Sequence, residues 1–434
     1  MDLVPGFMLL VQPLSSWMYA PTFRNLSVLI VGWIFAGQRT VTGLLRAAMV
    51  DRHHSSFHRV FASAAWSLDQ LGLAWLDTLK PWLGKGVIFL ALDDTLARKR
   101  GMKVFGAGMH LDPIISTRRT ALMHWGHSWV VLGVLMEFPL WPGRWFCLPI
   151  LFRLYLNIKS AQRDGVLYRT RSELAVEMLH VLAGHAKHQR FHVVADSAYG
   201  GITVAGKLPD RFDLTSRVLL DARLHAPVPK RTQGTNGRPR RRGQRLPTPR
   251  QMLDRRCRKM TCDIYGRKDS VRWADVICYL YKLPERAVKV VAVEPTTGGR
   301  TKQAFYSTAA DASARNVLAW YARRWAIEQM FRDTKNHLGF EEPQGWSPWA
   351  VRRTAPLAML VYGWIIVWFA SDGHRHWKPR PQSWHQDKPH ASLRDMLATL
   401  RLQTVKRYAF AAGIRGAKTR KLMKTLENIV QLAA

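Results

Sequence analysis

The sequence predicts a mixed α/β protein in which a central sheet domain lies between helical regions at both ends of the chain. Two short, nearly continuous apolar runs, VIFLAL (87–92) and FHVVA (191–195), are typical of central strands covered on both faces. A helical pattern at 172–186 precedes the second of them, which is the alternation expected of an α/β sheet. The first eighty and last ninety residues have long apolar helical faces instead.

Length and charge limit the class of protein. The chain has 434 residues, too many for one ordinary core, so several structural units are expected. Its 65 Lys and Arg against 30 Asp and Glu leave a net charge of +35, which indicates a polyanionic partner, either nucleic acid or an anionic membrane surface. Eighteen Trp and a hydrophobic content of 47% argue against a disordered basic protein.

The sequence predicts no membrane span and no export. The best candidate span, residues 357–370, has 14 residues, short of the roughly 20 that a bilayer requires, so we expect a buried core helix. The first residues lack the positive segment of a signal peptide. Four scattered Cys fit a reducing compartment, which predicts a cytoplasmic protein.

The helical and strand patterns divide the chain in order. Residues 1–85 read as a helical N-terminal region whose basic surface is compatible with DNA binding, and Pro81 and Gly84 end this pattern. Residues 86–215 read as the first part of the sheet domain. The expected elements of this part are strands at 87–94, 123–138 and 145–156, a helix at 172–186, and a strand that runs into a turn at 190–200.

The second half of the chain begins with a β-rich insertion at 216–305. Within it, residues 230–259 contain twelve Lys or Arg and one acid, so we expect a flexible basic loop whose arginines, Arg240, Arg241 and Arg242 among them, contact phosphates. A solvated loop that keeps the protein soluble is the alternative. Residues 306–345 read as the second part of the sheet domain, and 346–434 as a basic helical C-terminal region.

Four polar residues share one face of a helix predicted over 313–338. Tyr321, Arg324, Glu328 and Lys335 are separated by three, four and seven residues, which places them within roughly a 60° arc at 100° per residue. Together they form a carboxylate flanked by groups that bind phosphate. Taken singly, Glu328 would instead pair with a neighbouring arginine on the helix, and Tyr321 would be a core residue.

Two further acidic sites follow the apolar strands, Asp93-Asp94 and Asp196. Carboxylates at the carboxyl ends of strands lie where α/β sheets place ligands, although such acids also cap turns and helices. Two of them, with Glu328, could hold two divalent ions about 3.5–4 Å apart. Neighbouring strand residues point to opposite faces, so one member of the Asp93-Asp94 pair should bind metal, and we favour Asp93 because it directly ends the apolar run.

These motifs resemble those of bacterial insertion-sequence transposases of the DDE class, in the group with the YREK signature. That signature, Y-x2-R-x3-E-x6-K, is matched without a gap by Tyr321, Arg324, Glu328 and Lys335. The group's first acid lies in a DDT element, here 93–95, and its second in a D-x-x-Y-G-like element, here DSAYG at 196–200. The resemblance covers roughly residues 85–345.

The resemblance implies an RNase H-like catalytic core that the β-rich insertion interrupts, with Asp93 (or Asp94), Asp196 and Glu328 as catalytic residues. It implies two Mg²⁺ or Mn²⁺ ions, a homodimer assembled on double-stranded DNA at the element ends, hydrolytic nicking and strand transfer into target DNA. It also implies a nucleoid-associated protein. In some relatives an insertion Trp stacks on a flipped base; Trp273 is the corresponding candidate, or else a strand residue packed in its domain.

Two other functions remain open from the residues alone. A structure-specific nuclease or resolvase could use the same core without strand transfer. A non-catalytic, basic nucleic-acid-binding protein could use its acids structurally. The intact set of acids argues against the second of these, because a missing acid would have favoured it.

Overall fold

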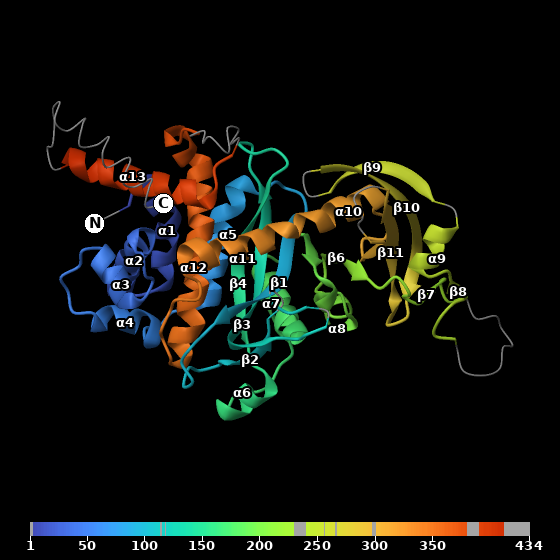
Figure 1. The fold of residues 1–434 in the computed structure, drawn as a ribbon, viewed down its shortest axis with the longest axis horizontal. Helices are drawn as coiled ribbons and strands as arrows, with labels where there is room; N and C mark the ends of the chain where they lie inside the picture. The colour runs from blue at the N-terminus through green and yellow to red at the C-terminus, as the bar shows by residue number, and fades with distance from the viewer. Residues whose placement is uncertain are drawn as a thin grey trace.

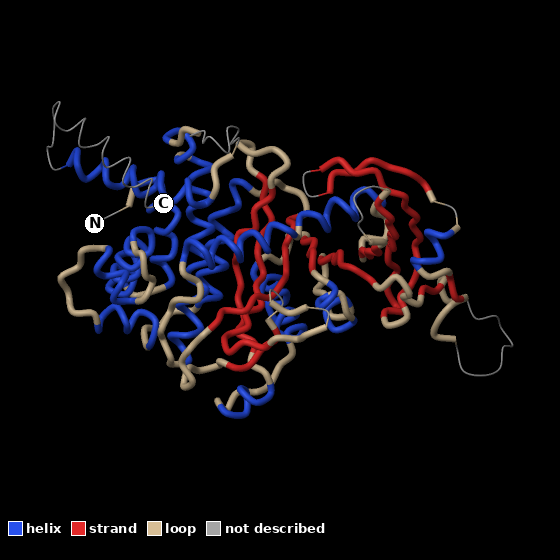
Figure 2. The backbone as a smooth tube through the Cα atoms, in the orientation of Figure 1, coloured by secondary structure: helices blue, strands red, loops and turns tan. Residues whose placement is uncertain are grey.

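A large mixed sheet extends through the middle of the protein, with helices at both ends of the chain (Figure 1, Figure 2). In the computed structural model, which describes residues 3–112, 115–117, 119–229, 240–255, 257–264, 267–296, 301–379 and 390–411, twelve strands form one continuous sheet. The predicted α/β class is therefore confirmed.

Five strands form the part of the sheet that carries the candidate acids. They are β1 (Ile88–Arg98), β3 (Met123–Glu137), β4 (Trp145–Tyr155), β5 (Phe191–Ala195) and β6 (Phe212–Val218), in the order β4-β3-β1-β5-β6, and the short β2 (Gly108–Leu111) also pairs with β3. β1, β3 and β4 are antiparallel, whereas β5 and β6 run parallel to β1. This arrangement is the predicted RNase H-like core.

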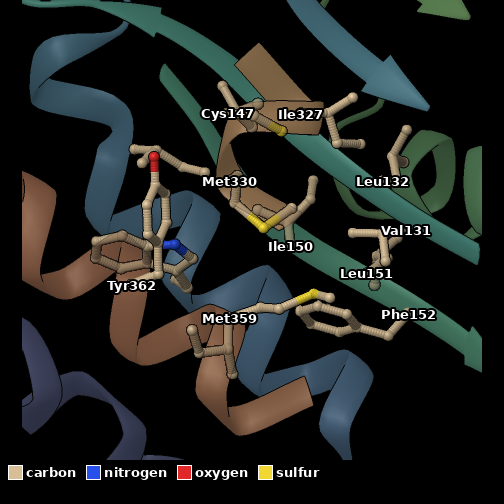
Figure 3. Close-up of a cluster of buried hydrophobic side chains, with 14 of the residues drawn as sticks. Val131, Leu132, Cys147, Ile150, Leu151, Phe152, Ile327, Met330, Met359 and Tyr362 are labelled. Atoms are coloured by element: carbon tan, nitrogen blue, oxygen red, sulfur yellow. The ribbon is translucent and has the colours of Figure 1, made fainter. Parts of the chain in front are cut away.

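Helices cover the faces of this sheet. α7 (Arg171–His185) packs on β3 and β4, and α11 (Trp325–Leu338) packs on β1 and β4. The shorter helical segments of this half are α6 (Ile158–Arg163), η3 (Ser197–Tyr199) and α8 (Ile202–Ala205). Figure 3 shows Ile327 and Met330 of α11 in the apolar layer between the sheet and α12, where Met359 and Tyr362 complete the packing.

The signature segment is not the single helix predicted over 313–338. It forms α10 (Ala314–Arg323) and α11, and Arg324 lies at the junction between them. The backbone of Arg324 stays close to helical values (φ −54°, ψ −31°), so α11 continues the direction of α10 (Figure 1). α11 ends at Gly339, whose φ of +60° is the left-handed conformation that glycine adopts without strain.

The apolar segment near residue 360 is a buried core helix, as predicted, but it is longer than expected. α12 spans Pro348–Ser371, because Ser347 and Pro348 begin the helix nine residues before the apolar run. Its 24 residues suffice in length and composition to cross a membrane, yet 89% of the apolar window is buried inside the protein. α12 lies between the sheet and the N-terminal helices (Figure 1).

The N-terminal region is helical, as predicted. Its elements are α1 (Pro5–Val11), η1 (Gln12–Trp17), α2 (Ala20–Phe35), α3 (Val41–Ala47), α4 (Ser55–Ala62), α5 (Leu68–Leu79) and η2 (Lys80–Trp82). Arg353 of α12 fastens this region to the core, because its buried guanidinium donates to the carbonyls of Phe61, Ala64 and Trp66.

The predicted insertion adds strands to the same sheet. They are β7 (Leu224–His225), β8 (Arg245–Leu246), β9 (Arg258–Ile264), β10 (Arg267–Leu280), β11 (Leu283–Pro295) and β12 (Gln303–Ser307). β12 pairs antiparallel with β6 and so joins the two parts of the sheet. The domain boundaries given above remain proposals.

The expectation of a flexible loop over 230–259 is wrong for its second half. Residues 245–254 form β8 and the helix α9 (Pro249–Asp254), and β9 begins at Arg258. A reciprocal capping box of Thr248 and Gln251 begins α9, and Leu253 is fully buried, so capping and apolar packing outweigh the local charge. Residues 230–239 and 256 lie outside the described part of the chain.

In the C-terminal region, α12 is followed by η4 (Gly373–His376) and α13 (Leu393–Ala411). The long helix α13 agrees with the helical region predicted here. Residues 380–389 and 412–434 of this region lie outside the described part of the chain.

Candidate active site

The strand register places Asp93 beside Asp196. Leu92 of β1 is paired with Ala195 of β5 in parallel register, and each aspartate is the next residue along its strand. The expectation that both acids end a strand is confirmed for Asp196, which directly follows β5. It is wrong for Asp93, which lies within β1, because pairing with β3 continues to Arg98. The two acids, 103 positions apart in the sequence, therefore sit at equivalent positions on neighbouring strands.

Arg324 connects Asp93 to Glu328. Its guanidinium donates through Nη1 to Asp93 Oδ2 at 2.9 Å and through Nη2 to Glu328 Oε1 at 2.5 Å. The Arg324 and Asp93 side chains are 11% and 16% exposed, and Glu328 is 33% exposed. The contact joins α11 to the sheet and leaves Glu328 open to solvent on one side.

Burial governs the protonation of Asp93. Burial raises the pKa of Asp93 to about 7; the Arg324 cation opposes this rise, and the negative charges of Asp94 and Asp196 add to it. The influence of Asp196 on the pKa of Asp93 follows from their neighbouring positions. A carboxyl of this kind prefers a cation nearby when it ionises.

The donor set suits a hard divalent cation. Asp93, Asp196 and Glu328 offer carboxylate oxygens, which Mg²⁺ prefers. Within the described residues, no group of three His, Cys, Asp or Glu side chains is drawn together closely enough to hold a metal ion. Instead, the Arg324 guanidinium occupies the position between Asp93 and Glu328, so a cation already bridges two of the three carboxylates. The residues fit a metal, provided that Arg324 moves from this position.

Asp196 combines a capping role with its place beside Asp93. Its carboxylate accepts a hydrogen bond from the Ser197 backbone N–H at 2.6 Å and caps the short helix η3. Its backbone carbonyl accepts from Ser216 Oγ of β6 at 3.0 Å. Asp196 is half-buried, so its carboxylate retains access to solvent.

Asp94 is engaged elsewhere. Tyr199 Oη donates to Asp94 Oδ1 at 2.8 Å, and Arg171 Nε lies 3.3 Å from Asp94 Oδ2. Arg171 also donates to Ser128 of β3. Because neighbouring strand residues face opposite sides of a sheet, Asp94 meets these partners while Asp93 meets Arg324.

The other two residues of the signature lie at either end of the Arg324–Glu328 pair. Tyr321 is buried against Phe305 of β12, with ring centroids 4.6 Å apart, and burial raises its pKa to about 12. Lys335 lies in the last turn of α11, with its ammonium 4.0 Å from a carboxylate oxygen of Glu341. Burial lowers the pKa of Lys335, and the negative charge of Glu341 partly offsets this decrease. The four signature residues therefore lie along α10 and α11, and Arg324 and Glu328 are the two at the sheet.

The candidates in the insertion lie outside this cluster. Trp273, on β10, packs on a small apolar core that includes Val291, and the Arg258 guanidinium lies 5.1 Å from its ring. Arg240 and Arg241 are exposed. Arg242 instead lies 3.8 Å from the Tyr281 ring centroid and donates to the Tyr281 carbonyl, so it helps to hold the insertion together.

The sequence interpretation assigned no role to three residues that support the Asp196 turn, Tyr199, Ser216 and Tyr306. Tyr199 could have been noticed, because it is the tyrosine of the DSAYG element. Ser216 and Tyr306 carry no local signal, since their contacts depend on strands that the chain brings together over long separations.

Comparison with known families agrees with this fold. No curated protein sequence matches the chain. A sequence model of the family described as DDE superfamily endonuclease matches residues 13–276, more than half of the chain. The match includes Asp93, Asp94 and Asp196 and begins within the N-terminal helices, far earlier than the 85–345 expected from the motifs; it ends before Glu328. The chain belongs to the DDE superfamily endonuclease family.

Proposed function

We propose that this protein is a DNA transposase that cleaves the ends of an insertion sequence in a metal-dependent reaction and joins them to target DNA. One observation carries the proposal: Asp93 of β1 lies beside Asp196, which directly follows β5, and Arg324 links Asp93 to Glu328 of α11. Three carboxylates that can hold divalent metal ions are the groups that metal-dependent phosphodiester cleavage requires.

Each residue has a stated role in this proposal. Asp93, Asp196 and Glu328 would hold two Mg²⁺ or Mn²⁺ ions, which when bound activate the attacking oxygen and stabilise the leaving one. Arg324 has a planar guanidinium that binds two oxygens of a phosphate group at once. Its Nε is buried and makes no hydrogen bond within the described residues, so it becomes available to a phosphate when Arg324 leaves its position between Asp93 and Glu328. Lys335 would hold a second phosphate.

The proposed partner is double-stranded DNA, both at the element ends and in the target. A net charge of +35 favours binding to the negatively charged phosphate backbone of DNA. We propose a homodimer in the active complex, since two element ends must be cut together, and a cytoplasmic, nucleoid-associated location.

The test is cleavage of a labelled duplex that carries the element end flanking this gene, with and without Mg²⁺. We expect Mg²⁺-dependent nicking at the end, followed by transfer of the freed 3′ hydroxyl into a target plasmid. Glu328→Gln, which keeps the shape of the side chain, should bind the duplex and leave it intact. Absence of any metal-dependent cleavage by the wild-type protein would overturn the proposal.

A second candidate is a structure-specific endonuclease, which the description of the matched family favours. The same assay separates the two. Cleavage of branched or flapped duplexes with no joining to the target plasmid would favour this second function.

A further inference from the structure

Asp94 and Tyr199 form a contact that joins β1 to the turn that carries Asp196. The Tyr199 hydroxyl donates to Asp94 Oδ1 at 2.8 Å, and Tyr199 is 1% exposed. Tyr199 lies three residues after Asp196, at the end of η3. The other oxygen of Asp94 lies 3.3 Å from Arg171 Nε, so both oxygens of this carboxylate are engaged.

Two further side chains hold the same turn. Ser216 Oγ of β6 donates to the carbonyl of Asp196 at 3.0 Å, and Tyr306 Oη of β12 donates to the carbonyl of Gly200 at 2.7 Å. A Cβ on Gly200 would lie 2.4 Å from Ser216 Oγ, so the turn rests directly on β6. The beginning, middle and end of the turn are thus tied to β6, β1 and β12.

The position of the Asp196 carboxylate depends on this turn. Asp196 is half-buried and follows the last residue of β5, so the strand itself does not hold its side chain. A functional carboxylate must be held within about 0.5 Å of its working geometry by the groups behind it. Such supporting groups typically contribute about 10- to 100-fold to metal affinity.

We propose that Asp94 is a positioning residue: with the Tyr199 hydroxyl it anchors the 196–200 turn and so sets the place of the Asp196 carboxylate beside Asp93. The inference rests on the proposed function, which makes Asp196 a metal ligand. Because Tyr306 belongs to the last strand of the insertion, the insertion also contributes to the geometry of the site.

The test is Mn²⁺ binding by the full-length protein without DNA, measured by electron paramagnetic resonance of the free ion. Tyr199→Phe removes the hydroxyl and keeps the ring. We expect its Mn²⁺ dissociation constant to rise about tenfold, with DNA affinity in EDTA unchanged. Asp196→Ala defines the loss expected when a ligand is missing.

Tyr155→Phe is the matched control. The Tyr155 ring lies 4.4 Å from the same Arg171 guanidinium and packs edge-on against the Tyr168 ring, with centroids 6.4 Å apart. This variant should bind Mn²⁺ as the wild type does. Combining Asp94→Ala with Tyr199→Phe should cost no more than Asp94→Ala alone, because Asp94→Ala already removes the hydrogen bond that Tyr199→Phe removes.

A Tyr199→Phe protein that binds Mn²⁺ as tightly as the wild type would overturn the inference, even if its thermal stability falls. Additive losses in the double variant would do the same. Wild-type protein that binds Mn²⁺ and never cleaves DNA would instead overturn the proposed function, and the comparison of metal affinities would still decide the role of Asp94.

Discussion

At the scale of single residues, two adjacent aspartates have different environments. Asp93 faces Arg324, and Asp94 faces Tyr199 and Arg171. Successive side chains of a strand point to opposite faces of the sheet, so the two aspartates meet different partners. A substitution of Asp93 and a substitution of Asp94 therefore test different contacts. The preference for Asp93 as the metal ligand remains a prediction.

Replacing the proposed ligands should separate catalysis from binding. Asp93→Ala, Asp196→Ala and Glu328→Ala should each reduce Mg²⁺-dependent cleavage to background while the affinity for DNA changes little, because affinity comes from many phosphate contacts. Asp94→Ala should retain part of the activity. Gel-shift and cleavage assays on the same duplex measure both. An inactive Asp94→Ala beside an active Asp93→Ala would reverse the assignment.

The raised pKa of Asp93 predicts that the metal-free protein becomes less stable to unfolding as pH rises. Its pKa rises from the ordinary 3.8 to about 7 through burial, so between these values the folded protein keeps a proton that the unfolded chain has lost. Stability from this group therefore falls as pH rises through this interval. In EDTA, Asp93→Asn should gain stability relative to wild type between pH 5 and pH 8, as urea unfolding would measure. An equal difference at both pH values would contradict the assignment.

Arg324 should not be replaceable by lysine. A single ammonium lacks the planar fork that contacts Asp93 and Glu328 together and that suits a phosphate. Arg324→Lys should lower the cleavage rate by about a hundredfold or more, the range observed when one preorganised donor is removed. The control is Arg332→Lys on the same helix, whose side chain is 64% exposed. Equal activity in both variants would mean that Arg324 has no special role.

At the scale of elements, the fold depends on how closely helices approach the sheet. α5 meets β4 at Gly72, where a Cβ would lie 1.7 Å from the Ile150 carbonyl oxygen. No side chain fits there without a shift of the backbone. The apolar pattern predicted a helical region over 1–85, but the close approach at Gly72 depends on the packing of α5 on β4.

Gly72→Ala should therefore destabilise the protein, although alanine favours helices. We expect a loss of about 1–3 kcal/mol in the free energy of unfolding, the usual cost of overpacking. Gly184→Ala in α7 is the control, since its Cβ would meet nothing within 4 Å, and it should be neutral or stabilising. Chemical denaturation of both variants provides the comparison. Equal effects would show that α5 can move away from β4.

At the scale of the whole molecule, the net charge of +35 should dominate association with DNA. In the basic segment of the insertion, Arg240 and Arg241 are exposed, whereas Arg242 stacks on Tyr281. Replacing Arg240 and Arg241 by Gln should make the log–log salt slope of binding shallower by about two units, equally on specific and random duplexes. An unchanged slope would favour a solvated segment. Arg242→Gln should instead lower the stability of the insertion.

The sequence by itself determined which elements form and which residue types the site offers. Short-range apolar patterns predicted the strand that contains Asp93, the strand that precedes Asp196, the helix at 172–186 and the burial of α12, because burial of one face depends on local spacing. The four-residue signature was visible for the same reason. Its division between α10 and α11 was not, since the backbone at Arg324 remains nearly helical.

Only the tertiary structure decided how these residues meet. The register of β1 with β5 brings Asp93 beside Asp196, and the packing of α11 on β1 brings Arg324 to Asp93 across 231 positions of sequence. The support of the Asp196 turn by Ser216 and Tyr306 depends in the same way on strands far apart in the chain. Such contacts leave no local pattern, because they arise from the pairing of whole strands and helices rather than from the spacing of neighbouring side chains.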